Sequence, residues 1–251
     1  MLTSQRKQYL LDILQRHGQI QAKMVSQELG LSEDTIRRDL RELAAEGKLQ
    51  RVHGGALPAS AAIGDFTQRQ NVATTGKAAI AQMAAHMIEP GQIVLLDGGT
   101  TAVQIARSLP PGLQATIVTH SPSVAVELVH HAGIEVVMIG GRLFKHSVVN
   151  VGASAIEAMA RIRADIFFMG VTGVHAEAGL STGDLEETYV KRALMARAAE
   201  TFVLASEEKL NAASAYVIAK VRDVAGVIVN READGAALAG LKAAGVNLVL
   251  A

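Results

Sequence analysis

Apolar residues in the first part of the chain recur with the spacing of amphipathic helices. A first helix is predicted from Ser4, as its N-cap, to His17, with Gly18 as its stop. Its apolar stripe consists of Tyr9, Leu10, Ile13 and Leu14. A second short helix is predicted over residues 22–29, ending at Gly30.

A third helix follows after a tight turn that contains Gly30. Ser32 is the expected N-cap, and Ile36, Leu40 and Leu43 recur at i, i+4 and i+7, so this stripe should face the core. The side chains that then point away from the core are Thr35, Arg37, Arg38 and Arg41. One short helix is therefore expected to expose three arginines.

Residues 48–52 alternate between polar and apolar after Gly47, and His53, Gly54 and Gly55 follow, which predicts a small β wing. Two helices joined by a tight turn and followed by a wing form a winged helix-turn-helix, whose second helix enters the DNA major groove. The residues predicted to contact DNA are Ser32, Thr35, Arg37, Arg38, Arg41, Lys48, Arg51 and His53. Alternatively, the arginines only solubilise an exposed helix face.

The composition changes after the wing. Residues 56–65 are rich in alanine, glycine and serine and include Pro58, which is typical of a linker. The predicted division is a DNA-binding domain over residues 1–57, a linker over 58–75 and a second domain over 76–251.

Short apolar strands alternate with alanine-rich helices in the second domain. The predicted strands cover residues 93–96, 116–118, 135–139, 165–169, 201–204, 224–229 and 246–250. Repeated strand-helix units predict an α/β fold with a mostly parallel sheet and helices on both faces. Ligands of such folds bind beyond the carboxyl ends of the strands.

The overall composition narrows the class of protein. Hydrophobic residues form 49% of the 251 residues and charged residues 19%, so a sizeable core can form. The absence of cysteine excludes disulfides and thiolate metal sites, and the histidines are scattered, so no metal site and no cofactor are predicted. The formal net charge of zero means that DNA contacts must come from a local patch. Without an export signal or membrane span, a cytoplasmic location is expected.

One turn of the second domain has the features of an anion site. It follows the strand over 93–96, opens a helix and consists of Asp97, Gly98, Gly99, Thr100 and Thr101. Glycines let the backbone approach a ligand closely, and free amides at a helix N-terminus attract an anion, so the turn is a candidate phosphate cradle. The alternative is a tight strand-to-helix turn capped by threonine.

Other polar and glycine residues follow neighbouring strands at the same sheet edge. Thr119 is a candidate to face the ligand, and Ser121 is expected to cap the next helix. Gly140 and Gly170 close the third and fourth strands. Turn formation alone is the alternative for both glycines.

The N-terminal pattern resembles the DeoR family of sugar-catabolism regulators, through the strings TIRRDL at 35–40 and RVHGGA at 51–56. The resemblance implies a repressor whose C-terminal domain is related in fold to ribose-5-phosphate isomerase and binds a sugar or sugar-phosphate effector. A homodimer or homotetramer is expected, because a two-fold protein matches a pseudo-palindromic operator.

The resemblance also assigns Glu187, Lys191 and Lys209 to the effector cavity, with Lys209 suited to a phosphate. Glu187 and Lys191 could instead form an ordinary i, i+4 surface pair. The chain departs from the Asp-Ser-Ser-Lys string that is usual in the family, because Glu207 and Glu208 stand before Lys209 and add negative charge.

An enzyme is the alternative to a sensor, namely a sugar-phosphate isomerase fused to a DNA-binding domain. Such an enzyme needs a carboxylate as general base, and related isomerases carry an acid-rich string after the strand that corresponds to 165–169. Residues 170–174 contain no carboxylate, so a sensor and no enzyme is predicted. A co-regulator that binds a protein partner is a third class.

Overall fold

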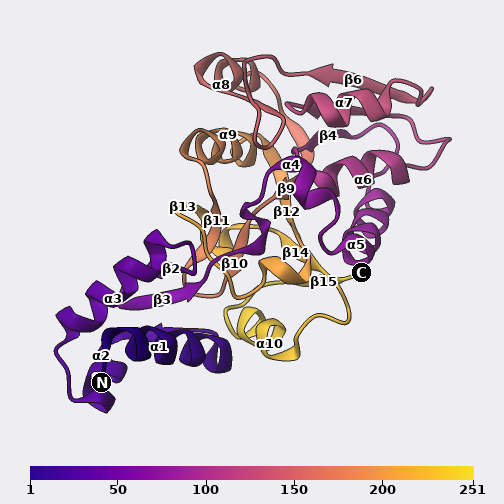
Figure 1. The fold of residues 1–251 in the computed structure, drawn as a ribbon. Coiled ribbons are helices and arrows are strands. Elements are labelled where there is room, and N and C mark those ends of the chain that lie inside the picture. The colour runs from indigo at the N-terminus through magenta and orange to yellow at the C-terminus, as the bar shows by residue number, and fades with distance from the viewer.

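A computed structural model describes residues 1–251 as a small N-terminal domain attached to a larger α/β domain (Figure 1). The N-terminal elements are α1 (Thr3–His17), β1 (Ile20–Gln21), α2 (Ala22–Leu29), α3 (Glu33–Ala45), β2 (Leu49–Val52) and β3 (Gly55–Pro58). The three strands pair antiparallel in the order β1-β3-β2. Leu10, Ile36 and Leu40 lie in the core between the helices, so the predicted helix faces and wing are confirmed.

The first helix begins earlier than predicted. Its N-cap is Leu2, so the prediction that Ser4 caps it is wrong. The side chain of Gln5 accepts a hydrogen bond from the backbone amide of Leu2, at 3.2 Å between the nitrogen and Oε1. This contact caps the helix end without a serine hydroxyl.

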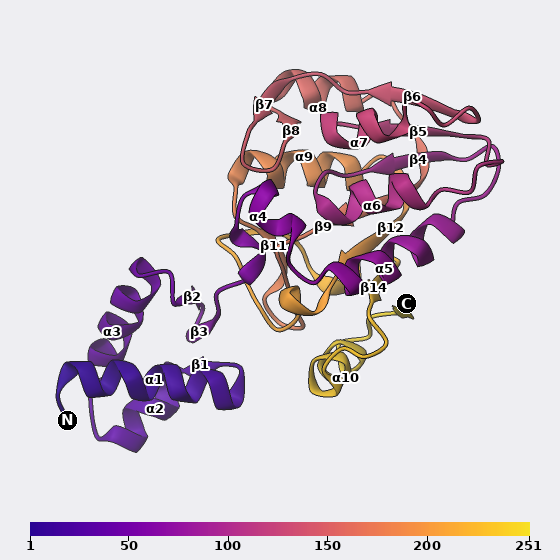
Figure 2. The same cartoon turned by 45° about the vertical axis from the view of Figure 1, so that its right-hand side comes forward.

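The segment predicted as a linker contains regular structure. The last residue of β3 is Pro58, a short 3₁₀ helix η1 (Ala61–Ile63) follows, and then come α4 (Phe66–Gln70) and α5 (Thr74–His86). In Figure 2 the chain leaves the N-terminal domain along β3 and reaches α4 against the larger domain.

A seven-stranded parallel sheet forms the centre of the larger domain, in the order β15-β14-β12-β9-β4-β5-β6. Its strands are β4 (Ile93–Leu96), β5 (Ala115–Thr119), β6 (Ile134–Met138), β9 (Ala164–Gly170), β12 (Ala198–Ala205), β14 (Gly226–Val229) and β15 (Leu248–Leu250). Each overlaps one predicted strand, so the predicted sheet is confirmed.

Helices cover both faces of this sheet (Figure 2). One face packs against α5, α6 (Thr100–Ser108) and α7 (Pro122–Leu128), and the other packs against α8 (Ala153–Met159), α9 (Leu185–Met195) and α10 (Gly235–Ala243). Neighbouring strand residues alternate between the two cores: Val94 and Leu96 face the α5–α7 layer, whereas Leu95 faces the α8–α10 layer.

Two small antiparallel sheets were not predicted. One pairs β7 (Arg142–Phe144) with β8 (Val149–Val151), and the other joins β10 (Gly173–His175), β11 (Gly179–Thr182) and β13 (Tyr216–Ala219). Short 3₁₀ helices η2 (Glu207–Lys209) and η3 (Val221–Asp223) complete the chain. No helix is both long enough and apolar enough to cross a membrane.

Candidate DNA surface and effector pocket

The third helix presents its polar face as predicted. The hydroxyl of Ser32 accepts a hydrogen bond from the amide of Thr35 at 3.2 Å and caps α3. Arg38 and Arg41 are exposed without an ion pair, whereas Arg37 pairs with Glu33 at 2.6 Å. The wing contributes a second exposed set, formed by Lys48, Arg51 and His53.

A groove runs between α3 and the wing and is lined in part by Arg37, Arg51 and His53. The two predicted DNA-contacting segments therefore share one surface. Lys48 differs from Arg51 and His53 in the wing, because it pairs with Glu46 at 2.7 Å.

An ion pair that the sequence reasoning missed anchors α3. The guanidinium of Arg6 in α1 donates to both carboxylate oxygens of Asp39, and both side chains are buried. Asp39 stands three residues after Ile36 and four before Leu43, so it lies on the apolar face of a helix that otherwise exposes its charges. This position was the signal that could have separated it from the surface acids. The pair fixes the angle of α3 against α1.

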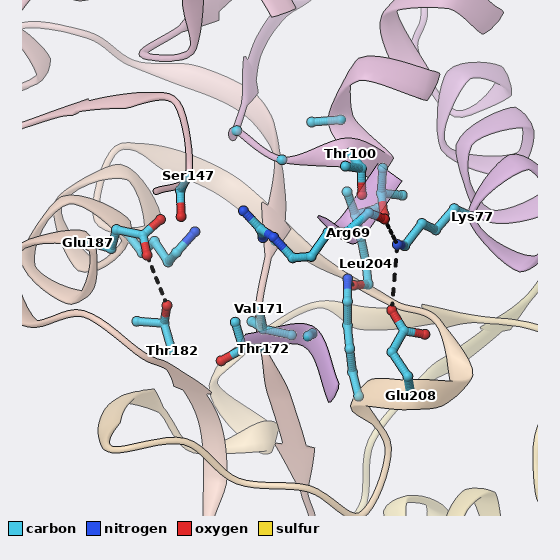
Figure 3. A pocket seen from close by; sticks show the side chains of 18 residues that line it. Arg69, Lys77, Thr100, Ser147, Val171, Thr172, Thr182, Glu187, Leu204 and Glu208 are labelled. Atoms are coloured by element: carbon cyan, nitrogen blue, oxygen red, sulfur yellow. Dashed lines mark hydrogen bonds and ion pairs between the residues drawn. The ribbon is translucent and has the colours of Figure 1, made fainter. Parts of the chain in front are cut away.

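A pocket opens in the larger domain where the direction of chain winding reverses. From β4 the chain adds β5 and β6 on one side of the sheet, and β9 and β12 on the other. Crevices at such a switch point, beyond the carboxyl ends of the strands, are the usual ligand sites of open parallel sheets. The pocket lies at this place (Figure 3).

Most of the predicted effector residues meet in this pocket. Those that line it are Gly98, Gly99, Thr100, Thr101, Gly170, Glu187, Lys191 and Lys209. Asp97, Thr119 and Gly140 do not line it. Thr119 is buried and accepts a hydrogen bond from the amide of Ser121, whereas Gly140 is exposed after β6.

The turn after β4 has the conformation that an anion cradle needs. Gly99 is the N-cap of α6 with a φ of 103°, which side chains rarely adopt. A Cβ on Gly98 would lie 2.1 Å from a methyl carbon of Val149, so glycine is required here too. The first amides of α6 have no partner within the helix, and they open at the pocket beside Thr100 and Thr101.

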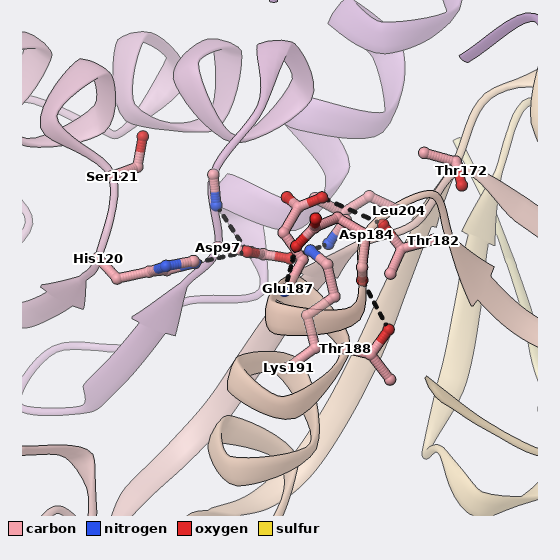
Figure 4. Close-up of polar contacts among 12 residues, drawn as sticks. Asp97, His120, Ser121, Thr172, Thr182, Asp184, Glu187, Thr188, Lys191 and Leu204 are labelled. Atoms are coloured by element: carbon pink, nitrogen blue, oxygen red, sulfur yellow. Dashed lines mark hydrogen bonds and ion pairs between the residues drawn. The ribbon is translucent and has the colours of Figure 1, made fainter. Parts of the chain in front are cut away.

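Asp97 lies behind this turn and holds it in place (Figure 4). One carboxylate oxygen accepts hydrogen bonds from the amide of Gly98 and from Nε2 of His120, each at 2.8 Å. The other accepts from the amide of Gly170 at 2.8 Å and from Nζ of Lys191. Asp97 therefore organises the site without facing the cavity.

The pKa of Asp97 reflects these contacts. Complete burial alone would raise it, but the charge of Lys191 and the hydrogen bond from His120 outweigh burial and hold the pKa of Asp97 well below its usual range. The carboxylate thus stays ionised and keeps Lys191 at the edge of the pocket.

Four cations and two carboxylates surround the cavity. Lys77 donates to the carbonyl of Arg69 at 2.8 Å, and Lys209 donates to the carbonyl of Leu204 at 3.1 Å. Burial lowers the pKa of Lys209 to about 8 and also lowers the pKa of Lys77. The remaining charged groups are Arg69, Lys191, Glu187 and Glu208.

The alternative that Glu187 and Lys191 form a surface pair is wrong. Both side chains are buried, and they have different partners: Thr182 donates to Glu187 at 3.3 Å, whereas Lys191 donates to Asp97. Ser121 is the N-cap residue of α7, as expected, but its hydroxyl makes no capping bond and instead donates to the carbonyl of Val148 at 3.2 Å.

Sequence reasoning missed two cations of the pocket. Arg69 comes from α4, inside the predicted linker, and Lys77 comes from the first turns of α5. No sequence motif marks either residue, because neither comes directly after a strand of the parallel sheet. Of the two carboxylates, Glu187 was assigned to the cavity through the family resemblance, whereas Glu208 was noted only as added negative charge before Lys209 and lines the pocket from η2.

The geometry defines a class of protein: a winged helix-turn-helix joined to an α/β domain with a polar, cation-rich pocket is a DNA-binding regulator that senses a small molecule. Comparison with known families agrees. The DeoR-like helix-turn-helix domain matches residues 6–61, and the DeoR C terminal sensor domain matches residues 72–231. The chain belongs to the DeoR family, as predicted, and is a transcriptional regulator and not an enzyme.

Known transcriptional regulators are similar to this chain over most of their length. The HTH-type transcriptional regulator GlpR of Haloferax volcanii is 32% identical over 99% of this chain and 98% of its own length. The HTH-type transcriptional repressor GlcR of Bacillus subtilis is 30% identical over 92% of this chain and 90% of its own. The glycerol-3-phosphate regulon repressor of Haemophilus influenzae is 29% identical over 89% of this chain and 88% of its own.

Two solved structures match the chain at low identity. The full-length sorbitol operon regulator SorC of Klebsiella pneumoniae matches with a TM-score of 0.46 and 13% identity, covering 96% of this chain and 99% of its own. Ribose 5-phosphate isomerase A of Methanocaldococcus jannaschii matches with a TM-score of 0.39 and 20% identity, covering 53% of this chain and 52% of its own.

Proposed function

We propose that the chain is a repressor of carbohydrate catabolism genes whose effector is a phosphorylated sugar, bound with its phosphate at the turn formed by Gly98, Gly99, Thr100 and Thr101. One observation carries the proposal: the N-terminus of α6 opens into a pocket that four cations surround. Partial positive charge at a helix N-terminus and full charges on the side chains both favour an anion.

The rest of the pocket suits sugar hydroxyls. Glu187 and Glu208 supply carboxylate acceptors, and Ser147, Thr172 and Thr182 supply hydroxyl groups. The Haemophilus influenzae relative is named after glycerol-3-phosphate, a small phosphorylated polyol. A ligand of that chemistry would offer a phosphate to the turn and hydroxyls to the rest of the pocket. Glu208 adds an acceptor where the family usually has serine, so the effector of this chain is expected to place a hydroxyl there.

We further propose that the protein works as a homodimer or homotetramer, since one winged domain reads too few bases for a specific operator. The proposed location is the cytoplasm, where operator DNA and phosphorylated sugars meet.

A thermal-shift screen with matched pairs of free and phosphorylated sugars tests the effector. A ligand that binds only the folded protein raises its melting temperature, so the phosphorylated member of one pair should raise it and the free sugar should not. Thr101→Asp, which places a negative charge in the turn, should abolish the shift. Thr3→Asp, an exposed change of the same chemistry on α1, serves as the matched control.

Two results would contradict the proposal. The first is that no phosphorylated sugar shifts the melting temperature while a free sugar does. The second is that folded Thr101→Asp responds like the wild type. If Thr101→Asp is unfolded, Lys209→Met gives the same test by removing a pocket cation.

A further inference from the structure

The segment between the wing and α5 is bound to the sensor domain along its length. Ser60, two residues after β3, donates a hydrogen bond to the carbonyl of Thr172 in the pocket wall. The amide of Phe66 donates to the carbonyl of His146 at 2.8 Å, and Nε2 of His146 lies 2.9 Å from the carbonyl oxygen of Ile63. We call residues 59–70 the strap.

The strap forms part of the pocket itself. Ala62 of η1 and Arg69 of α4 both line the cavity. Figure 3 shows the Arg69 side chain extending from α4 into the middle of the pocket. A Cβ built on Gly99 would lie 3.8 Å from Nη1 of Arg69, so the guanidinium lies against the proposed anion turn.

Arg69 differs from the three lysines because most of its side-chain N–H donors have no acceptor within the protein. Each lysine already donates to a protein acceptor: Lys77 to a carbonyl, Lys191 to Asp97 and Lys209 to a carbonyl. Arg69 makes one long hydrogen bond, from Nε to the carbonyl of Asp65 at 3.4 Å. Its Nη2 is buried and has no partner.

A buried donor without a partner is costly, and a guanidinium offers a fork of donors that matches a phosphate. Burial also lowers the pKa of Arg69, against the attraction of Glu187, Asp97 and Asp65. An anion at the Gly99 turn would satisfy the free donors and offset the burial of the charge. The guanidinium that carries this unsatisfied donor lies, through Nη1, against the turn where the anion is proposed.

We infer that Arg69 is an effector-binding residue, and that the bound anion pins the strap to the sensor domain through it. The inference rests on the proposed function, because it needs an anion at the Gly99 turn. Its consequence is regulatory. Since the strap continues directly from wing strand β3, the occupancy of the pocket fixes where the DNA-binding domain leaves the sensor domain.

Hydrogen-exchange mass spectrometry on the full chain, with inorganic phosphate as the probe, tests this. In the wild type, saturating phosphate should slow exchange in peptides that cover residues 59–70. Arg69→Gln should weaken phosphate binding by roughly tenfold or more, the usual value of a hydrogen bond to a charged group. It should also lose the phosphate-dependent protection of the strap, even at phosphate concentrations that saturate the variant.

Variants separate this inference from the proposed function. Arg161→Gln, an exposed arginine on the sensor domain, should behave as the wild type, and Arg69→Lys, which keeps the charge but not the fork, should be intermediate. Lys209→Met tests the pocket itself. If Lys209→Met loses phosphate binding while Arg69→Gln binds phosphate and protects the strap like the wild type, the inference is wrong and the proposed function stands. If wild-type protein binds neither phosphate nor any phosphorylated sugar, both are wrong.

Discussion

Lys191 of α9 donates a hydrogen bond to the buried carboxylate of Asp97, which follows β4 and lies 94 positions earlier in the chain. The same carboxylate holds the amides of Gly98 and Gly170, which belong to two neighbouring strand ends. One ionised group therefore joins three segments of the pocket. Its loss should affect the fold as well as the site.

Asp97→Asn should destabilise the sensor domain by about 3–5 kcal/mol at pH 7, because it leaves the buried Lys191 without a counter-charge. The pKa of Asp97 is lowered in the folded protein, so its contribution is present above the unfolded pKa of about 4 and is lost as the pH falls below it. Denaturant unfolding of both proteins at pH 7 and pH 3 measures this, and the difference should shrink at pH 3. Glu200→Gln, an exposed change on β12, is the control. A constant difference at both pH values would contradict the assignment.

Lys209 should give a pH dependence of the same sign as Asp97, but in an alkaline range of pH. Its folded pKa of about 8 lies below the ordinary value of 10.5, so between these two pH values the unfolded chain binds the extra proton. Stability should therefore rise with pH from about 8 to about 10.5. The comparison of wild type with Lys209→Met isolates this group. As the pH rises over this range, the free energy of unfolding of the wild type should increase relative to that of the variant. Parallel curves would show that the lysine is not buried as a cation.

Arg38→Ala should lower specific operator affinity roughly 5- to 150-fold, the value of about 1–3 kcal/mol for a good contact between an arginine and a base. Arg38 is exposed and unpaired on α3, whereas Arg37 must first leave Glu33. An operator selected from a random DNA library by the wild type allows titration at fixed salt. Arg161→Ala on the sensor domain should bind like the wild type. Unchanged affinity of Arg38→Ala would remove Arg38 from the recognition surface.

Asp39→Asn should weaken the DNA-binding domain without touching DNA directly. The change leaves Arg6 buried without its partner, which typically costs about 3–5 kcal/mol, whereas Glu33→Gln breaks only an exposed pair worth no more than about 1 kcal/mol. Amide exchange in α1 and α3 reports the local loss. Equal exchange in the two variants would mean that the buried pair does not anchor α3.

The repeating elements could be predicted from the sequence because each carries its own periodicity. Ile36, Leu40 and Leu43 mark one helix face, and the residues of β4 mark a buried strand at its observed position. The strands from β7 to β13 outside the main sheet have three or four residues each. Such lengths are too short for a period to stand out.

From the residue pattern alone, the site was predictable only where it follows a strand. Gly98 to Thr101 come directly after β4, so the rule for parallel sheets finds them, and Lys191 and Lys209 needed the family resemblance. Arg69 lies on a five-residue helix in a stretch rich in small residues, and only the three-dimensional fold brings it to the pocket. The sequence analysis placed Asp97 at the correct turn but predicted that it contacts the effector. A sequence does not tell whether a carboxylate faces a ligand or a buried lysine.

The hydrogen bond from Ser60 to Thr172 has a consequence for engineering hybrid regulators. A chimera that joins a foreign DNA-binding head at residue 75, the end of the composition-based linker, would discard the strap and with it one wall of the pocket. A junction at Ala59 keeps residues 60–75 with the sensor they contact. Heads exchanged at this point should bring their own operator preference while the fused protein answers to the original metabolite.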